Sequence, residues 1–490
     1  MRPFGPATTA FAAPESEAAP ARAGVRLLAI GLFALLALLA GRAVQLAFSG
    51  DPLAVARAAG AHASITRADL TDRNGVLLAT TVRAYALTAT PSRVWNPRET
   101  TSALMRMFPD LNSADTERRL SDRGRQLAYL RRGLTPAQRE AVLALGLAGI
   151  GFETEERRVY PQGAMAGHAL GFTDVDLNPL AGAERGLDAQ IRSAGAAGAS
   201  VALSLDVRLQ YALESELDAA ARSAGASGGA AILLDGRSGE TLALASWPGF
   251  DPNNAGAAPA AGRRDRVAGD VHELGSTIKP FTIAMALEEE ATNSAETFDL
   301  AQPFDIDGHV VEDHEPIAGL VGLREILARS SNIGAARLAL RIGATKQRSY
   351  LERLGLLSPT SLEIGRNQAP LAPRAQGRRD VAGIGFGYGL AATQAALAGA
   401  YTVFTNQGAR IAPTLLRRAP EDAVERIDVF SPQTTRLVVS YLRTSVTDGT
   451  GRAAEVPGLE VAGKTGTAEK LGQDAVYDES RNFSSFAGVF

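Results

Sequence analysis

A serine and a lysine stand three positions apart at Ser276 and Lys279, preceded by Gly275 and followed by an apolar pattern typical of a helix. On a helix, positions i and i+3 share a face, so the lysine amine can approach the serine hydroxyl. A serine hydroxyl becomes an effective nucleophile when a neighbouring base takes its proton. A lysine can be that base only if burial or another cation lowers its pKa. The pair therefore predicts a serine nucleophile that is activated by a lysine.

Lysine is scarce in this chain, so its positions are informative. The four lysines, Lys279, Lys346, Lys464 and Lys470, stand among 50 basic residues, and every other basic residue is arginine. A guanidinium stays protonated in proteins, so arginine could not replace a lysine that acts as a base. Pro280 follows Lys279 directly and removes a backbone donor from the first turn of the expected helix. We interpret this as local strain of the kind that active sites tolerate.

A second polar group follows at Ser330-Ser331-Asn332, between the helical patterns GLREILAR and IGAARLALRIG. A hydroxyl and an amide two positions apart in a tight turn can relay a proton and hold a substrate carbonyl. The same residues could instead only cap the following helix, since serine and asparagine are favoured at helix N-termini. On these residues alone, we favour the cap.

The third group is Lys464-Thr465-Gly466-Thr467, which follows the alternating apolar residues Leu459 and Val461. A strand that presents a lysine and hydroxyls beside a glycine lets a peptide-like substrate lie close to the backbone. Its cation would attract a substrate carboxylate and would also help to lower the pKa of Lys279.

The same residues have a rival interpretation as a nucleotide site. Gly458 to Thr465 reads GLEVAGKT and matches the pattern G-x-x-x-x-G-K-[ST], and the strand AAILLD ending at Asp235 resembles a Walker B strand. A P-loop needs a buried apolar strand before its first glycine and a helix after its lysine. Pro457 stands before the glycine, and TGTAEKLGQDAVYDES shows no helical period after the lysine. We therefore reject a nucleotide site.

The elements that would position these groups can be read from periodicity. A short strand followed by an amphipathic helix is predicted for residues 201–225, VALSLDVRLQYALESELDAAARSAG. Two strands joined by a turn at Asp235–Gly239 are predicted for residues 228–248, GGAAILLDGRSGETLALASWP. Alternating helices and strands continue to Phe490, inside the apolar run SSFAGVF, where we expect an unfinished strand and a truncated C-terminus.

Length and composition favour a multidomain globular protein. A chain of 490 residues suggests two or three domains, and 46% hydrophobic with 21% charged residues argues against global disorder. The net charge of -3 gives no basic footprint for nucleic acid. The absence of cysteine excludes disulfides and thiol catalysis. None of the five histidines forms an HExxH pair, and no metal or other cofactor is expected.

The chain divides into four predicted parts. Residues 1–24, rich in alanine and proline, are expected to form a disordered cytoplasmic tail. Residues 25–48 contain an apolar run that reaches the ~20 residues of a membrane span if Arg42 snorkels. We expect a single-pass anchor there, with a cleaved signal peptide as the alternative, and either one takes the bulk of the chain out of the cytoplasm. Residues 50–200 would form a mixed domain with short strands, and residues 201–490 would carry the three groups.

S-x-x-K, S-x-N and K-T-G in this order resemble the signature of penicillin-binding proteins and serine β-lactamases. The stretches HELGSTIKPF, SSNIG, GYGLAATQAALAGAYTVFTNQG and GTGRAAEVPGLEVAGKTGTAEK are similar to class B penicillin-binding proteins. Two sequence motifs of the family's non-catalytic pedestal domain resemble RADLTDRNG and RRVYPQGAMAGHALGF. In the first of them, Ala68 stands in place of the usual glycine. SSN together with GYG is more similar to the division-specific (septal, FtsI-type) branch than to the elongation branch.

The resemblance implies a multidomain α+β fold. A transmembrane helix would precede a mostly β pedestal (dimerisation-like) domain, and a transpeptidase domain with an antiparallel sheet flanked by helices would follow. The implied location is the bacterial inner membrane, with the catalytic domain in the periplasm. The implied partners are peptidoglycan stem peptides ending in D-Ala-D-Ala, β-lactam antibiotics, a membrane glycosyltransferase of the FtsW/SEDS type and other division proteins.

The implied activity is peptidoglycan D,D-transpeptidation through an acyl-enzyme on Ser276, inhibited by β-lactams. Lys279 would be the base, while Ser330 and Asn332 would shuttle protons and bind the substrate amide. A neighbouring stem amine would resolve the acyl-enzyme.

The substrate-binding residues implied by the resemblance are Lys464, Thr465, Gly466 and Thr467. Lys464 and Thr465 would hold the carboxylate end of the substrate. The backbone N–H groups of Ser276 and Thr467 would form an oxyanion hole.

Other functions use the same three groups. A D,D-carboxypeptidase or β-lactamase would share them, but a small secreted hydrolase needs neither a pedestal nor an anchor. A third class is a penicillin-sensing or purely structural division subunit with a silent acylation site, and the intact Ser276, Lys279 and Lys464 argue against it. An elongation-type transpeptidase is the alternative within the family.

Overall fold

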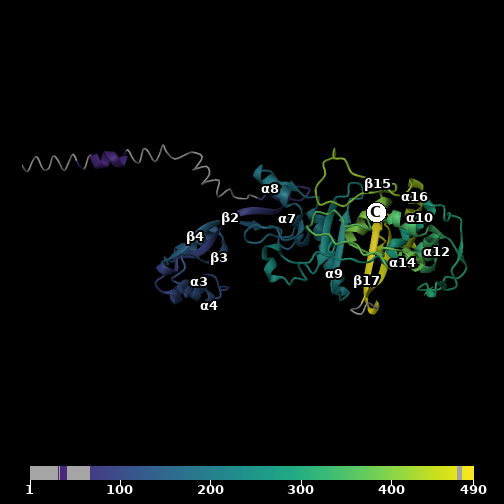
Figure 1. The fold of residues 1–490 in the computed structure, drawn as a ribbon, viewed down its shortest axis with the longest axis horizontal. Coiled ribbons are helices and arrows are strands. Elements are labelled where there is room, and N and C mark those ends of the chain that lie inside the picture. The colour runs from purple at the N-terminus through teal and green to yellow at the C-terminus, as the bar shows by residue number, and fades with distance from the viewer. Residues whose placement is uncertain (1–30, 32–33, 41–66, 472–476) are drawn as a thin grey trace, which may run out of the picture. The chain divides into compact units, whose positions relative to one another are not determined.

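The computed structural model describes residue 31, residues 34–40, residues 67–471 and residues 477–490, and the chain divides into two units, Met1–Ser64 and Ile65–Phe490 (Figure 1). In the first unit, the described residues are helical and expose their leucine side chains. Among the described residues, no helix is both long and apolar enough to cross a membrane. The predicted tail (1–24) and most of the predicted anchor (25–48) lie outside the described residues.

The second unit begins with a five-stranded sheet in the order β3-β2-β1-β5, with β4 also paired to β2. Its strands are β1 (Leu70–Thr71), β2 (Leu77–Ala89), β3 (Ala128–Leu134), β4 (Ile150–Val159) and β5 (Val201–Ala202). β2 is the long strand, antiparallel to both β3 and β4. β5 pairs in parallel with β1, with Leu70 opposite Val201. The sheet therefore includes residues from both sides of the predicted boundary between 200 and 201.

Three helices and a short 3-10 turn belong to the outer part of this region: η1 (Pro91–Arg93), α3 (Pro97–Met107), α4 (Ser113–Ser121) and α5 (Pro136–Leu143). The side chains of Asn96, Asn112 and Thr135 accept hydrogen bonds from backbone N–H groups and cap the three helices. Leu87 of β2 is buried together with Leu104 of α3 in a small core. This core and the caps stabilise the three helices.

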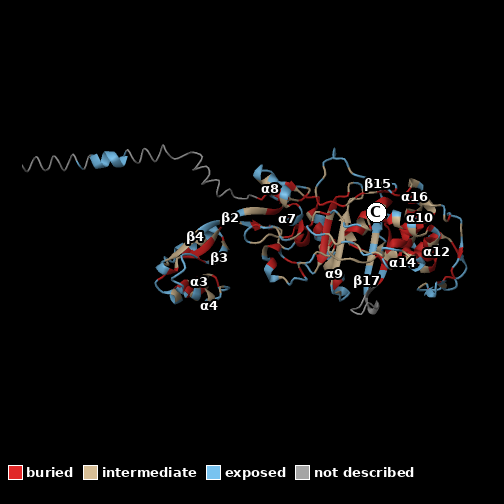
Figure 2. Ribbon diagram, viewed as in Figure 1, coloured by how far each residue is buried: buried red, intermediate tan, exposed pale blue. Residues whose placement is uncertain are grey.

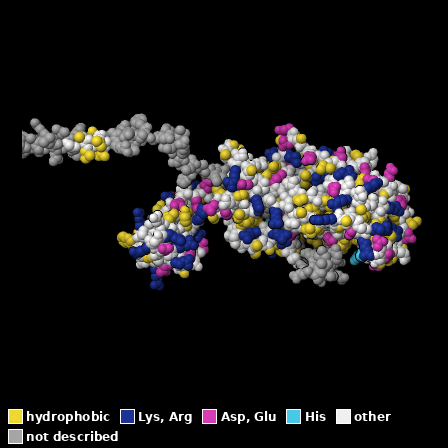
Figure 3. All heavy atoms as spheres, in the orientation of Figure 1, with side chains coloured by type: hydrophobic (Ala, Val, Ile, Leu, Met, Phe, Trp, Pro, Cys, Tyr) yellow, Lys and Arg dark blue, Asp and Glu magenta, His cyan; other side chains and the backbone are white. Residues whose placement is uncertain are grey.

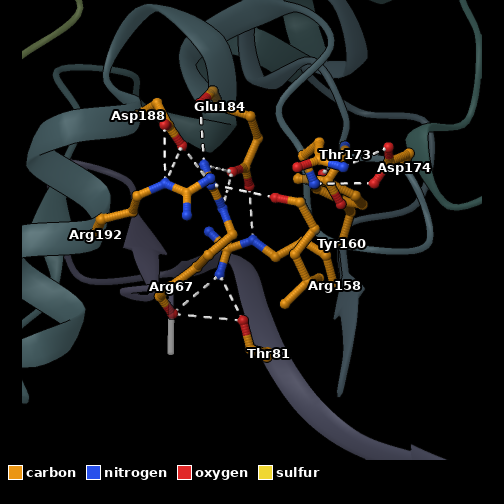
Figure 4. A network of polar contacts seen from close by, with 11 residues as sticks. Arg67, Thr81, Arg158, Tyr160, Thr173, Asp174, Glu184, Asp188 and Arg192 are labelled. Atoms are coloured by element: carbon orange, nitrogen blue, oxygen red, sulfur yellow. Dashed lines mark hydrogen bonds and ion pairs between the residues drawn. The ribbon is translucent and has the colours of Figure 1, made fainter. Parts of the chain in front are cut away.

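A buried ion network connects the start of this sheet to α7 (Gly182–Gly186) and α8 (Asp188–Ala196) (Figure 4). Glu184 is fully buried, and its Oε2 accepts hydrogen bonds from Arg67 Nε at 2.9 Å and Nη2 at 2.6 Å. Its Oε1 accepts a bond from Arg158 Nε at 2.6 Å. Arg67 also donates to Asp188 Oδ1 at 2.5 Å. Two buried guanidinium groups thus share the Glu184 carboxylate, which offsets the cost of removing both from water.

The helices that follow are α6 (Gly167–Leu170), α9 (Val207–Ser223), α10 (Lys279–Glu288), α11 (Leu323–Ala328), α12 (Asn332–Ile342), α13 (Ala344–Arg353), α14 (Arg378–Phe386), α15 (Gln394–Tyr401) and α16 (Pro432–Thr447), with 3-10 turns η2 (Pro252–Ala257), η3 (Gly275–Ile278), η4 (Thr402–Phe404) and η5 (Arg452–Ala454). The strands are β6 (Gly229–Leu234), β7 (Thr241–Trp247), β8 (His272–Glu273), β9 (Phe298–Asp299), β10 (Phe304–Ile306), β11 (His309–Val311), β12 (Leu320–Val321), β13 (Ala391–Ala392), β14 (Ala409–Arg410), β15 (Ile427–Asp428), β16 (Ala462–Leu471) and β17 (Tyr477–Val489). The strand and helix expected from residue 201 are confirmed as β5 and α9, and the expected hairpin is confirmed as β6 and β7.

The largest core surrounds α10, which packs against α12, α14 and α16. The buried residues run through this group of helices (Figure 2). Phe281 of α10 is fully buried and stacks on Phe404, with ring centroids 5.3 Å apart. Because α10 is buried on all sides, its first turn is held rigidly, and that turn carries Lys279.

The resemblance implies an antiparallel sheet, and within the described residues the strands of this region pair as six separate two-stranded antiparallel sheets, of which the hairpins β6–β7 and β16–β17 are the longest. Within the described residues, β6 pairs with β7 and β16 pairs with β17, and each hairpin is a separate two-stranded sheet. α15 packs on both β6 and β17. A cavity of about 980 Å³ is lined by residues 230–234 of β6 and residues 483–489 of β17. Acidic and basic side chains are interspersed over the visible face of the molecule (Figure 3).

Candidate active site

Ser276 lies in a tight turn, η3, that two other segments enclose. Gly275 has a φ of 52°, a conformation that favours glycine. A Cβ on Gly275 would lie 2.7 Å from the carbonyl oxygen of Thr467 in β16. On the other side, the Gly275 N–H donates to Gly387 O at 3.0 Å, and a Cβ on Gly387 would lie 2.0 Å from Gly275 O. The nucleophile turn is therefore fixed by backbone contact with two segments remote in the sequence.

Lys279 is the first residue of α10, and it is 0% exposed. Its Nζ donates hydrogen bonds to Ser330 O at 2.6 Å, Asn332 Oδ1 at 2.7 Å and Ser330 Oγ at 3.2 Å. Ser330 Oγ in turn donates to Ser276 Oγ at 2.9 Å. The structure therefore brings all four predicted catalytic residues together, and the polar link from Ser276 to Lys279 runs through Ser330.

The electrostatic surroundings lower the pKa of Lys279. Burial lowers the pKa of Lys279 well below its ordinary value, and the positive charge of Lys464 lowers it further. The carboxylate of Asp313 acts in the opposite direction and raises this pKa. A lysine with a lowered pKa is neutral over a wider range of pH, and a neutral amine can accept a proton.

The prediction of strain at Pro280 is wrong. Pro280 occupies the first turn of α10, where its missing N–H removes no helical hydrogen bond. The uncommon backbone conformation of the site lies instead at Ser330, whose φ of 60° is rare for residues other than glycine.

The two interpretations of Ser330-Ser331-Asn332 apply to different residues. Ser331 is the N-cap of α12, and its Oγ accepts a hydrogen bond from the Gly334 N–H at 2.9 Å. Ser330 and Asn332 face Lys279 instead. The turn thus caps a helix and also presents two polar groups to a buried amine.

Lys464 lies inside β16 and is 0% exposed. Its Nζ donates to Thr465 O at 3.0 Å, Thr465 Oγ1 at 3.2 Å and Thr450 Oγ1 at 3.3 Å. Burial lowers the pKa of Lys464 to about 8. A Cβ on Gly466 would lie 2.6 Å from Ser485 Oγ and 2.9 Å from Thr277 Cγ2, so this glycine lets β16 approach η3. Thr467, the next residue, is exposed.

The prediction that no helix follows Lys464, on which the P-loop interpretation failed, is confirmed. Residues 462–471 form a single strand, β16, so Lys464 and Thr465 do not lie at the start of a helix. Asp235, the supposed end of a Walker B strand, belongs to the turn between β6 and β7.

Two residues of the site could not be singled out from the sequence. Asp313, in the loop after β11, accepts hydrogen bonds from Ser331 and Asn332. Thr450 lies within 2.7 Å of Thr465, measured between their Oγ1 atoms. Thr450 stands between two glycines, in a stretch that resembles the family, but nothing in its spacing predicts this contact.

This arrangement can perform nucleophilic acyl transfer. A half-buried serine hydroxyl is linked through a second hydroxyl to a buried amine, and a second cation lies nearby on a strand. Such a set can deprotonate the serine and attract an anionic acyl donor.

Comparisons with known proteins agree with the geometry. The family model described as the penicillin-binding protein transpeptidase domain matches residues 229–490, and that of the penicillin-binding protein dimerisation domain matches residues 63–190. The chain is similar to the probable peptidoglycan D,D-transpeptidase FtsI of Caulobacter vibrioides, with 39% identity over 86% of this chain and 72% of that protein. It is 30% identical to the peptidoglycan D,D-transpeptidase FtsI of Escherichia coli, over 84% of this chain and 75% of that protein.

The fold also matches a solved structure. Penicillin-binding protein 3 of Mycobacterium tuberculosis, in complex with aztreonam, has a TM-score of 0.66, with 24% identity and 86% of each chain covered. The fold, the two family models and the relatives lead to one conclusion. This chain belongs to the penicillin-binding proteins, with a dimerisation domain followed by a transpeptidase domain.

Proposed function

We propose that this chain is a peptidoglycan D,D-transpeptidase that works through an acyl-enzyme on Ser276. The observation that carries the proposal is the hydrogen-bonded path from Ser276 Oγ through Ser330 Oγ to the buried amine of Lys279. The relatives from C. vibrioides and E. coli are named peptidoglycan D,D-transpeptidases, which agrees with this path.

In the acylation step, the two hydroxyls rotate so that Ser276 donates to Ser330 and Ser330 donates to neutral Lys279, which takes the proton. Ser276 Oγ then forms a bond to the carbonyl carbon of the penultimate D-Ala of a stem peptide. The peptide bond to the terminal D-Ala breaks, and the proton leaves with the amine of that D-Ala. Asn332 supports the base, because its Oδ1 accepts a hydrogen bond from Lys279 Nζ at 2.7 Å.

The proposed role of β16 is to hold the substrate beside Ser276. Lys464 and Thr465 bind the terminal carboxylate, and charge-assisted hydrogen bonds of this kind are stronger than neutral ones. The close approach of β16 to η3 at Gly466 supports this role, because it places the strand directly against the nucleophile turn. The N–H groups of Ser276 and Thr467 stabilise the oxyanion that forms during attack.

In the second step, an amine from a neighbouring stem peptide attacks the acyl carbon. Lys279 acts as the base again by taking a proton from this amine, the ester bond to Ser276 breaks, and the proton passes from Lys279 to Ser276 Oγ, which restores the free enzyme. β-Lactams acylate the same hydroxyl, and their carboxylate occupies the place of the substrate carboxylate.

We also propose a septal role, with residues 25–48 as an inner-membrane anchor and the catalytic domain in the periplasm. The FtsI names of the relatives and the Ser330-Ser331-Asn332 motif support this assignment. A membrane glycosyltransferase of the FtsW/SEDS type and other division proteins are the proposed partners. A fluorescent fusion that spread along the lateral wall instead of gathering at mid-cell would contradict the septal role.

Labelling with a fluorescent penicillin tests the nucleophile. The wild-type chain should label, and Ser276→Ala should not, because no other hydroxyl replaces the nucleophile. Ser223→Ala is the matched control, since Ser223 is the exposed last residue of α9 and should not affect labelling. Labelling of Ser276→Ala at the wild-type level would refute the proposal.

A second assay separates transfer from hydrolysis. Peptidoglycan fragments with pentapeptide stems should yield cross-linked products together with released D-Ala. Release of D-Ala without cross-links would instead favour a D,D-carboxypeptidase, which uses the same residues.

A further inference from the structure

One carboxylate outside the three sequence groups contacts the second of them at two points and the next residue, Ile333, at a third. Asp313 lies in the loop between β11 and β12. Its Oδ1 accepts hydrogen bonds from the backbone N–H groups of Asn332 at 2.5 Å and Ile333 at 3.0 Å. Its Oδ2 accepts a bond from Ser331 Oγ at 2.7 Å. Asp313 therefore binds both the backbone and a side chain of the turn that faces Lys279.

The contacts to Ser331 and Asn332 lie next to Ser330, whose backbone conformation is unfavourable. Ser330 adopts a φ of 60°, which is unfavourable for a residue with a side chain unless its surroundings hold it. The Asn332 side chain is oriented from the same loop, because its Nδ2 donates to Glu312 O at 3.0 Å. With Nδ2 held there, Asn332 Oδ1 is left to accept the hydrogen bond from Lys279 Nζ. The loop thus determines which atoms of the turn face the amine.

The loop also contributes charge. The charged groups that act on Lys279 are Lys464 in β16 and Asp313, while its hydrogen-bond partners in Ser330 and Asn332 are neutral. Lys464 and burial lower the pKa of Lys279, and Asp313 raises it. Asp313 is also well placed for a negative charge, since it lies at the N-terminus of α12, where backbone N–H groups point outward.

We propose that Asp313 is a positioning residue of the acylation step: its carboxylate holds the Ser330-Ser331-Asn332 turn against Lys279 and opposes the charge of Lys464 there. This inference rests on the proposed function, because it assigns Asp313 a part in the activation of Ser276. Asp313 contacts neither Ser276 nor Lys279 through a hydrogen bond and acts through the turn. A carboxylate that only capped α12 would affect stability alone, so the test needs a readout of the base itself.

The readout is the rate of acylation by a fluorescent penicillin as a function of pH, measured on the full chain. At low pH the rate falls because Lys279 becomes protonated, and at higher pH it reaches a plateau. Asp313→Asn removes the charge that raises the pKa of Lys279, so the fall at low pH should move to lower pH. The plateau should drop by roughly ten- to hundred-fold, as expected for the loss of hydrogen bonds to a charged acceptor.

Two further variants separate charge from position. Asp313→Glu keeps the charge but moves the carboxylate by one methylene, so its plateau should drop while the low-pH fall stays in place. Glu315→Gln removes a negative charge from an exposed residue of the same loop and should behave as wild type. Asp313→Glu also keeps the test informative if Asp313→Asn does not fold.

The outcomes of these measurements separate the proposals. An unmoved low-pH fall in folded Asp313→Asn, an equal shift in Glu315→Gln, or a wild-type plateau in Asp313→Glu would each overturn the role of Asp313. Wild-type chain that does not label at any pH would overturn the proposed function and this inference with it. A normal wild-type profile with an unchanged Asp313→Asn profile would overturn this inference alone.

Discussion

Glu184→Gln is the substitution for which the structure gives the clearest energetic expectation. It keeps the size of the side chain but replaces a carboxylate at a position that is 0% exposed. The carboxylate accepts hydrogen bonds from Arg67 at 2.9 and 2.6 Å and from Arg158 at 2.6 Å. An amide NH₂ cannot accept any of them. Both buried guanidinium groups therefore lose the negative charge of Glu184, and one of them also faces a donor.

The size of the effect follows from this burial. Removing one partner of a buried ion pair costs about 3–5 kcal/mol, because an uncompensated charge stays behind. This equals roughly a hundred- to several-thousand-fold change in the unfolding equilibrium. Asp188 offsets only part of this loss of stability. Its side chain is 29% exposed, and of the two arginines it contacts only Arg67.

Urea unfolding followed by circular dichroism measures the change. Glu455→Gln is the matched control, because Glu455 pairs with Arg443 where the two side chains are 40% and 31% exposed. Exposed pairs contribute about 0–1 kcal/mol, so this variant should unfold near the wild-type midpoint. In the double variant Arg158→Met, Glu184→Gln, part of the lost stability should return. A loss in Glu184→Gln no larger than in Glu455→Gln would refute the reasoning.

Two other predictions concern the site itself. Lys464 has a pKa of about 8, so it is charged below that pH and loses its charge as pH rises through it. The KM of a substrate with a terminal carboxylate should therefore rise above pH 8 in wild type and stay flat in Lys464→Arg, and a parallel rise in both would contradict the proposed carboxylate contact. Gly387→Ala should abolish penicillin labelling, because its Cβ would lie 2.0 Å from Gly275 O. Gly389→Ala, also at a positive φ but with its nearest neighbour 3.9 Å away, should keep most of its labelling, and equal labelling of the two variants would show that the close approach is unimportant.

The predicted catalytic residues could be identified because three short patterns in a fixed order carry them. The structure brings Ser276, Lys279, Ser330 and Asn332 into hydrogen-bond contact. The scarcity of lysine was informative for a physical reason: Lys279 and Lys464 are both fully buried, where the pKa of a lysine can fall. Their roles in catalysis stay predictions until the variants above are measured.

The role of Asp313 could not be predicted in the same way. It depends on a loop that returns to the start of α12, and no periodicity or spacing encodes that return. The contact between Gly275 and Gly387 depends on the same kind of long-range packing. Apart from the β6–β7 hairpin, which a short turn indicated, strand pairing could not be predicted either, because alternation indicates that a strand exists but not which strand it joins. The resemblance implies an antiparallel sheet, whereas the described strands after β5 pair as separate two-stranded antiparallel sheets.

The two hairpins have a practical consequence for every assay described above. Within the described residues, β6 and β17 each pair on one side only, and their residues line the same cavity. Strand edges with free backbone donors and acceptors are templates for association between molecules. Protein concentration is therefore a variable to control in each measurement. A labelled fraction that falls as concentration rises would report edge-to-edge association of chains and not a change in the chemistry of Ser276.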